Sequence, residues 1–211
     1  GVKAWQVIDA AEAMRPMIGS ETVVVPMQNG VETPGQLISV LGEKAVVVGL
    51  GGLVSYIVEP GHIIHAGGEP FVSFGESDDS ATERTRRLLQ AFQNAGVNAN
   101  IPSNIHAALW GKLAFMAANS GVGAITRVPS GQWRRLAGSW EMAQQVVKEV
   151  LAVASAKDID MPGDAFSSTI ARLEGSPQDS TSSMQRDLMD GKPSELEVQS
   201  GGVVRLGLEV G

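Results

Sequence analysis

Lys112 has the sequence setting that most favours chemistry. It stands between Leu109-Trp110 and Leu113-Ala114-Phe115, an apolar stretch with helical spacing. Removing an ammonium from water lowers its pKa, so that it can donate a proton near neutral pH. A lysine whose stem lies along a helix surface while its head stays in water explains the same sequence without chemistry. Both interpretations place Lys112 on a helix.

Asn29 is the second candidate, within Gln28-Asn29-Gly30 directly after the apolar run Thr22–Met27. Such a run is typical of a strand buried on both faces of a parallel sheet, and open α/β sheets bind ligands at the carboxyl ends of their strands. An asparagine amide there can bind a ribose hydroxyl or a substrate oxygen. An ordinary Asn-Gly turn is the alternative.

A third group of polar residues, Ser182-Ser183, Asp187 and Glu195, surrounds one turn between two predicted helices. Glu195 could accept a hydrogen bond from a ligand hydroxyl or hold a lysine. Equally, Ser182 could cap one helix and Glu195 could be a first-turn acid of the next.

Other motifs give no site. Gly49-Leu50-Gly51-Gly52-Leu53-Val54 and Gly121-Val122-Gly123-Ala124-Ile125-Thr126 approach the dinucleotide pattern, but both lack its last glycine and a strand-to-helix turn. No histidine, aspartate or glutamate set has metal-ligand spacing, so we predict no metal.

The elements that must position these residues fall into two parts. The first is α/β, with predicted strands before residue 102 and with helices over Trp5–Ile18, over Thr33–Leu41 and over Ala81–Asn94, the last capped by Asp78 or Ser80. The predicted strands are Thr22–Met27, Ala45–Leu50, Leu53–Val58, Gly61–Ala66, Pro70–Gly75 and Val97–Ile101. The second part is all-α, with predicted helices from Ser103 or Asn104 through Met116, and over Trp140–Lys157, Ala165–Leu173, Ser182–Met189 and Glu195–Leu208. We therefore place a domain boundary near Pro102.

Composition excludes several classes of protein. The 211 residues carry 16 basic and 23 acidic side chains, a formal charge of −7 that argues against a nucleic-acid binder. The absence of cysteine excludes disulfides, thiolate nucleophiles and zinc–thiolate sites. No apolar run approaches the ~20 residues of a membrane span, and no signal peptide is recognisable, so we expect a cytoplasmic protein without a membrane partner.

These segments together resemble the ketopantoate reductase (2-dehydropantoate 2-reductase) family. The resemblance covers nearly the whole chain and rests on motifs that agree in order and spacing: Val2-Lys3-Ala4-Trp5-Gln6, Gln28-Asn29-Gly30, Leu109-Trp110-Gly111-Lys112-Leu113-Ala114, Ser182-Ser183-Met184-Gln185-Arg186-Asp187 and Glu195.

The resemblance implies NADPH-dependent reduction of 2-dehydropantoate to pantoate, on the route to pantothenate and coenzyme A. It implies a partial Rossmann-like dinucleotide-binding domain over residues 1–102 and a helical substrate and dimerisation domain over 103–211, with a possible homodimer. It gives the residues these roles: Lys112 as proton donor and substrate contact, Ser120 and Ser183 as further substrate contacts, and Lys3, Asn29, Ser55 and Glu195 as cofactor contacts.

Two departures leave alternatives open. Met116 and Ser120 stand where the family often has substrate-binding asparagines, so another 2-keto acid could be the substrate. The Gly-rich first turn of the nucleotide-binding fold belongs before Gly1, which suggests a piece of a longer protein. A catalytically inactive dimerisation or binding module is the remaining alternative.

Overall fold

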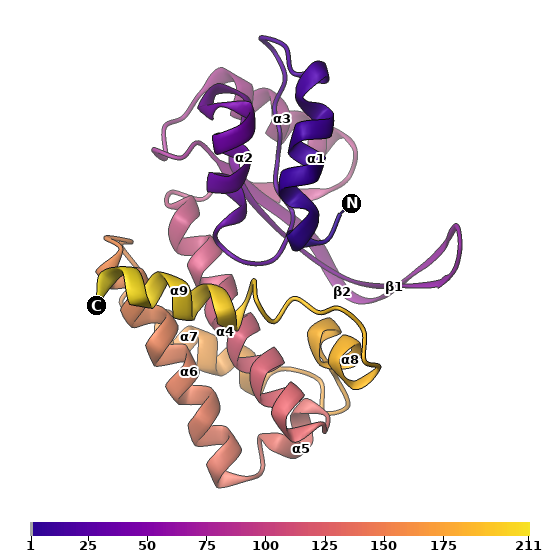
Figure 1. Ribbon diagram of the computed structural model, residues 1–211, viewed down its shortest axis with the longest axis vertical. Helices are drawn as coiled ribbons and strands as arrows, with labels where there is room; N and C mark the ends of the chain where they lie inside the picture. Colours follow the sequence, from indigo (N-terminus) through magenta and orange to yellow (C-terminus); the bar gives the residue numbers. More distant parts are fainter. Residues whose placement is uncertain (1) are drawn as a thin grey trace.

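The chain has an α/β part that precedes a bundle of helices. The computed structural model describes residues 2–211. In Figure 1 the α/β part occupies the upper half and the helices after residue 104 the lower half, joined through α4 (Ile105–Thr126). The predicted α/β plus all-α order is confirmed.

A three-stranded sheet forms the centre of the α/β part. Strands β1 (Val48–Glu59) and β2 (His62–Gly75) are antiparallel, and β3 (Asn98–Asn100) runs parallel to β2 in the order β1-β2-β3. The predicted hairpin is confirmed, with Gly61 at φ +83° in its turn. The shorter predicted runs were wrong, because the segments on each side of the turn form one continuous strand each, interrupted only by register shifts.

The run from Thr22 to Met27 is not a full strand. It is extended, but it joins the sheet only through a parallel bridge between Val24 and Val46, where the Val24 amide donates to the Ala45 carbonyl at 2.7 Å. Its side chains still pack on two sides, since Val24 contacts one core cluster while Val23 and Val25 contact another. The apolar pattern thus predicted packing on both sides, but the three valines are only half-buried, Met27 is exposed, and the predicted regular pairing was wrong.

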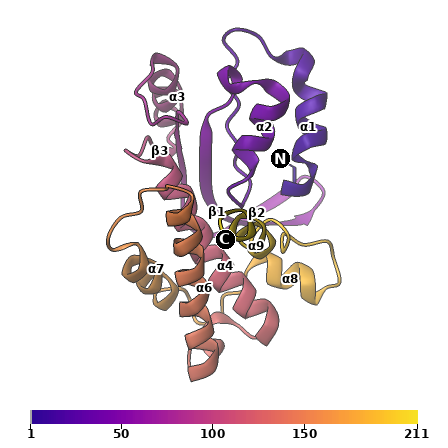
Figure 2. The same ribbon diagram turned by 60° about the vertical axis from the view of Figure 1, so that its left-hand side comes forward.

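Three helices lie in the same part of the chain as the sheet (Figure 2): α1 (Val7–Met14), α2 (Thr33–Leu41) and α3 (Glu83–Asn94). Short 3-10 turns extend α1 at both ends. Thr82, not Asp78 or Ser80, caps α3, because its Oγ1 accepts from the Thr85 amide at 3.3 Å.

The second part is entirely helical within the described residues. Besides α4 it contains α5 (Ser130–Trp133), α6 (Ala137–Ala156), α7 (Ala165–Glu174), α8 (Ser183–Met189) and α9 (Ser200–Val210). As expected, Asn104 caps α4 and Ser182 caps α8 through their side-chain oxygens. Helix α9 begins later than predicted, so Glu195 lies in the preceding turn and is not a first-turn acid.

The long helix α4 holds this part together. Its sides bear buried residues such as Trp110, Leu113 and Val122, which share one core with Val147 of α6 and Leu173 of α7. A helix packed on most sides is fixed in position, so a side chain on its remaining face is held firmly.

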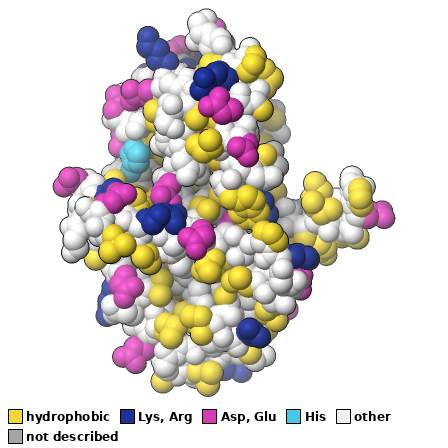
Figure 3. All heavy atoms as spheres, viewed as in Figure 1, with side chains coloured by type: hydrophobic (Ala, Val, Ile, Leu, Met, Phe, Trp, Pro, Cys, Tyr) yellow, Lys and Arg dark blue, Asp and Glu magenta, His cyan; other side chains and the backbone are white. Residues whose placement is uncertain are grey.

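The outer half of the β1–β2 hairpin extends away from the body and carries apolar side chains (Figure 3). Leu53, Ile57 and Ile63 are each more than 60% exposed there. No helix among residues 2–211 is long and apolar enough to cross a membrane.

Candidate active site

Lys112 extends from α4 to the sheet of the first part. Its Nζ donates a hydrogen bond of 2.6 Å to the carbonyl oxygen of Gly51 in β1. Burial, with a smaller contribution from the positive charge of Arg172, lowers the pKa of Lys112 from 10.5 to about 8. An ammonium has three donors, so two are left after the Gly51 bond. Lys112 is therefore a partly buried ammonium that can release a proton near neutrality.

Asn29 and Glu195 form a second polar pair between the two parts. The Asn29 Nδ2 donates to Glu195 Oε2 at 2.8 Å, although the residues are 166 positions apart. Glu195 is only 5% exposed, and its Oε1 receives no hydrogen bond from any residue the structure describes. The negative charge of Glu195 opposes the fall in the pKa of Lys112, which places the two groups within electrostatic reach. The predicted Asn29 and Glu195 are thus together and near Lys112.

A glycine sets the position of Asn29. Gly30 has φ +93°, a left-handed conformation that favours glycine, and an added Cβ there would come within 3.0 Å of the Val198 carbonyl oxygen. The turn therefore packs closely against the segment that carries Glu195.

Lys3 and Ser183 lie at the side of this region, toward α8. Lys3 Nζ is 3.3 Å from Asp187 Oδ2, an exposed ion pair that connects the start of the chain to α8. Ser183 is the first residue of α8 and is half-buried. Their roles toward a cofactor and a substrate stay predictions.

Within the described residues, neither Ser55 nor Ser120 forms a hydrogen bond with Asn29 or Glu195. Ser55 is paired with His65 in the projecting half of the hairpin, four residues beyond Gly51. Ser120 is completely buried, and its Oγ has no hydrogen-bond partner among the described residues. The adjacent Asn119 is instead partly exposed and lies seven residues after Lys112, on the same side of α4.

Three features of the site were missed by sequence reasoning. The Gly51 carbonyl that holds Lys112 had no signal in the sequence, because any residue has a carbonyl. Phe115 and Arg172 were the other two: the Arg172 guanidinium carbon lies 4.2 Å from the centre of the Phe115 ring, and the charge of Arg172 acts on the pKa of Lys112. The spacing of Phe115 three residues after Lys112 could have placed it on the same side of the helix.

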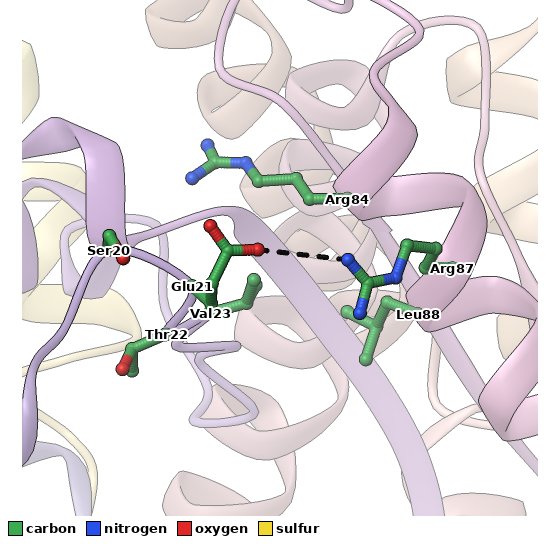
Figure 4. A pocket seen from close by; sticks show the side chains of 7 residues that line it. All are labelled: Ser20, Glu21, Thr22, Val23, Arg84, Arg87 and Leu88. Carbon is green, nitrogen blue, oxygen red and sulfur yellow. Dashed lines mark ion pairs between the residues drawn. The ribbon is translucent and has the colours of Figure 1, made fainter.

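A separate hollow of about 410 Å³ opens elsewhere on the α/β part (Figure 4). Glu21 and Arg87, which line it, form an ion pair of 3.7 Å, and Arg84 is a further lining residue. Arg84 forms an ion pair with the buried Glu76 and lowers the pKa of that carboxyl group. None of the candidate residues lines this hollow. Within residues 2–211 no three histidine, aspartate or glutamate side chains gather as a metal site.

Both parts of the chain match sequence families. Residues 1–79 match the family "Ketopantoate reductase PanE/ApbA", and residues 104–211 match "Ketopantoate reductase PanE/ApbA C terminal". A 2-dehydropantoate 2-reductase of Archaeoglobus fulgidus is 30% identical over 192 residues, which cover 90% of this chain and 62% of the relative. The chain therefore spans less than two thirds of the length of that relative.

Solved structures share the fold. A PanE/ApbA family ketopantoate reductase from Ralstonia eutropha JMP134 has a TM-score of 0.85 and 31% identity, over all of this chain and 68% of the other. D-mandelate dehydrogenase, solved as a ternary structure with NADH and anilino(oxo)acetate, has a TM-score of 0.89 over 99% of this chain and 68% of the other. At 20% identity, this second likeness shows the fold alone.

The matched families cover strand β1, whose Gly51 carbonyl binds Lys112, and the helical part that carries Lys112 and Glu195, in the order the motifs predict. The chain belongs to the ketopantoate reductase PanE/ApbA family.

Proposed function

We propose that the protein reduces the ketone of a 2-keto acid, with Lys112 as the proton donor. The observation that carries the proposal is the ammonium of Lys112, partly buried, held by the Gly51 carbonyl and close to the Asn29–Glu195 pair. Within the family, the proposed substrate is 2-dehydropantoate, with pantoate as the product, in the synthesis of pantothenate and coenzyme A. The proposed cofactor is NADPH.

The residues present fit one half of such a cofactor. The free Oε1 of the buried Glu195 can accept from a ribose hydroxyl, while Asn29 holds the other carboxylate oxygen. Lys3, which forms an ion pair with Asp187 of α8, and Ser55 are the further proposed cofactor contacts. When bound, the reduced nicotinamide would supply the hydride that reaches the ketone carbon.

Lys112 would then act on the ketone oxygen. Its ammonium donates a hydrogen bond to that oxygen, stabilises the negative charge that develops there, and transfers a proton to it to give the hydroxyl. The hydrogen bond to the Gly51 carbonyl fixes the position of the ammonium between α4 and β1. Residues 1–102 would thus belong to a dinucleotide-binding domain, and residues 103–211 to a substrate and dimerisation domain, with Ser183 as a proposed substrate contact.

A different 2-keto acid is the second candidate, and Met116 favours it. This residue is half-buried on α4 one turn after Lys112, where its thioether cannot provide the hydrogen bonds of an amide. A larger apolar group on the substrate would fit beside it better than a hydroxyl.

A panel of 2-keto acids, assayed with the intact protein and with NADPH and NADH in turn, tests the proposal. We expect reduction of at least one 2-keto acid, 2-dehydropantoate being the first candidate, and a higher kcat/KM with NADPH. Preference for a more apolar keto acid would support the second candidate. No oxidation of either nucleotide with any member of the panel would contradict both.

A further inference from the structure

We propose that Arg172, lying on the ring of Phe115, is the site that binds the carboxylate of the substrate. This inference rests on the proposed function and deepens it: Lys112 would bind the ketone oxygen and Arg172 the acid group of the same molecule. None of the motifs that identify the family contains Arg172.

The guanidinium of Arg172 lies over the ring of Phe115 and donates no hydrogen bond to any of residues 2–211. Its central carbon lies 4.2 Å from the Phe115 ring centre, a cation–π contact that holds the plane of the fork. No carboxylate or carbonyl within residues 2–211 accepts a hydrogen bond from its nitrogens; the residue as a whole is exposed, while partial burial of the guanidinium lowers its pKa. An arginine fork matches a carboxylate in a two-bond arrangement, so the free edge is suited to an anionic group.

Another arginine, Arg134, hydrogen-bonds the carbonyls at the end of α7 in place of Arg172. Arg172 is in the last turn of α7, where a cation can hydrogen-bond the final carbonyls of the helix. Arg134 does this instead, because its nitrogens donate to Leu173 O at 2.6 Å and to Ser176 O at 2.8 Å. Arg172 is therefore not needed to satisfy the end of α7.

The position of Arg172 beside Lys112 suits a 2-keto acid. Phe115 follows Lys112 by three residues, so a cation over this ring stands at the same side of α4 as the proposed proton donor. The charge of Arg172 also contributes to the lowered pKa of Lys112, as expected for two cations in one region. Among residues 2–211, the carboxylate that acts on Lys112 is that of Glu195, which already accepts a hydrogen bond from Asn29. A ligand with an anionic group next to a carbonyl would balance this excess of positive charge.

Two variants of the intact protein separate binding from a structural role. Arg172→Gln removes the charge and the fork, whereas Arg172→Lys retains the charge only. For the best 2-keto acid we expect KM to rise on the order of 10- to 100-fold in Arg172→Gln, and less in Arg172→Lys, with a smaller change in kcat. Arg135→Gln is the matched control, because it removes one exposed charge from the same helical part and should leave KM unchanged.

The methyl ester of the same keto acid is the decisive second substrate. Since it has no negative charge, the parent and Arg172→Gln should reduce it with similar kcat/KM. Direct binding of oxamate, a non-reactive carboxylate, should weaken in Arg172→Gln by calorimetry in parallel with KM.

The outcomes distinguish this inference from the proposed function. Equal losses with the acid and the ester, or a KM for the acid within about twofold of the parent in a folded Arg172→Gln variant, would overturn the role of Arg172 while leaving the reductase intact. A parent protein that reduces no 2-keto acid would overturn the proposed function itself.

Discussion

Replacing Lys112 with methionine should abolish turnover while making the protein more stable at neutral pH. Methionine keeps the length and the helix propensity of the side chain, so packing on α4 is largely retained. Loss of the proton donor and of its charge should lower kcat on the order of 10²- to 10⁴-fold.

The stability gain can be worked out from the pKa. A fall from 10.5 to about 8 means that the folded protein holds the proton less tightly than the unfolded chain does. At pH 7 this difference costs the folded protein about 3 kcal/mol, which Lys112→Met removes. Loss of the hydrogen bond to Gly51 offsets about 1 kcal/mol, leaving a net gain of about 2 kcal/mol.

The sign of the pH dependence follows from the same difference. The loss of folding stability caused by the charged Lys112 is fully present below pH 8 and becomes smaller as the pH rises toward 10.5. The gain in stability of Lys112→Met over the parent should therefore be close to zero at pH 10. Urea unfolding of the parent and the variant at pH 7 and pH 10, with kcat measured at pH 7, checks both parts.

Lys148→Met provides the control, because Lys148 is an exposed lysine in the middle of α6. It should change neither turnover nor the pH dependence of stability. If Lys112→Met behaves like this control, with turnover within about threefold of the parent, Lys112 is a surface lysine and the reasoning is refuted.

Three further variants test the surroundings. Glu195→Gln should raise the KM for the nucleotide several-fold with little change in the KM for the keto acid, since the carboxylate is argued to accept from the cofactor; a change confined to the keto acid would contradict this. Ser120→Ala should leave KM unchanged and unfold at the same or higher urea concentration, because the buried Oγ has no partner; a clear rise in KM would instead support the predicted substrate contact. Glu76→Gln should destabilise the protein by about 1–3 kcal/mol at pH 7, and the difference should shrink as the pH falls through the lowered pKa of Glu76, because the parent then loses its charged bond to Arg84; a pH-independent difference would count against this pair.

Local patterns predicted most of the helices and the order of the two parts. Helical spacing located α6 and α7, and the side chains of Asn104 and Ser182 marked the starts of α4 and α8. Strand pairing was harder to predict, because whether the run from Thr22 to Met27 pairs as a strand depends on partners distant in sequence.

The site was predictable where a motif names a side chain and unpredictable where contacts are made by the fold. The nearness of Asn29 and Glu195 follows from no local pattern, since 166 residues separate them. The family resemblance implied a substrate contact for Ser120, whereas the structure places that residue on the packed side of α4. No sequence motif could indicate Arg172, because the aromatic ring that it contacts, Phe115, belongs to another helix.

The pH dependence of keto acid reduction tests the central claim most directly. With Lys112 as the proton donor, kcat/KM of the intact protein should be level below pH 8 and should fall about tenfold for each further pH unit, as the ammonium loses its proton. The residual activity of Lys112→Met should lack this fall. A parent profile that stays level through pH 9.5, or the same fall in Lys112→Met, would contradict the assignment of Lys112.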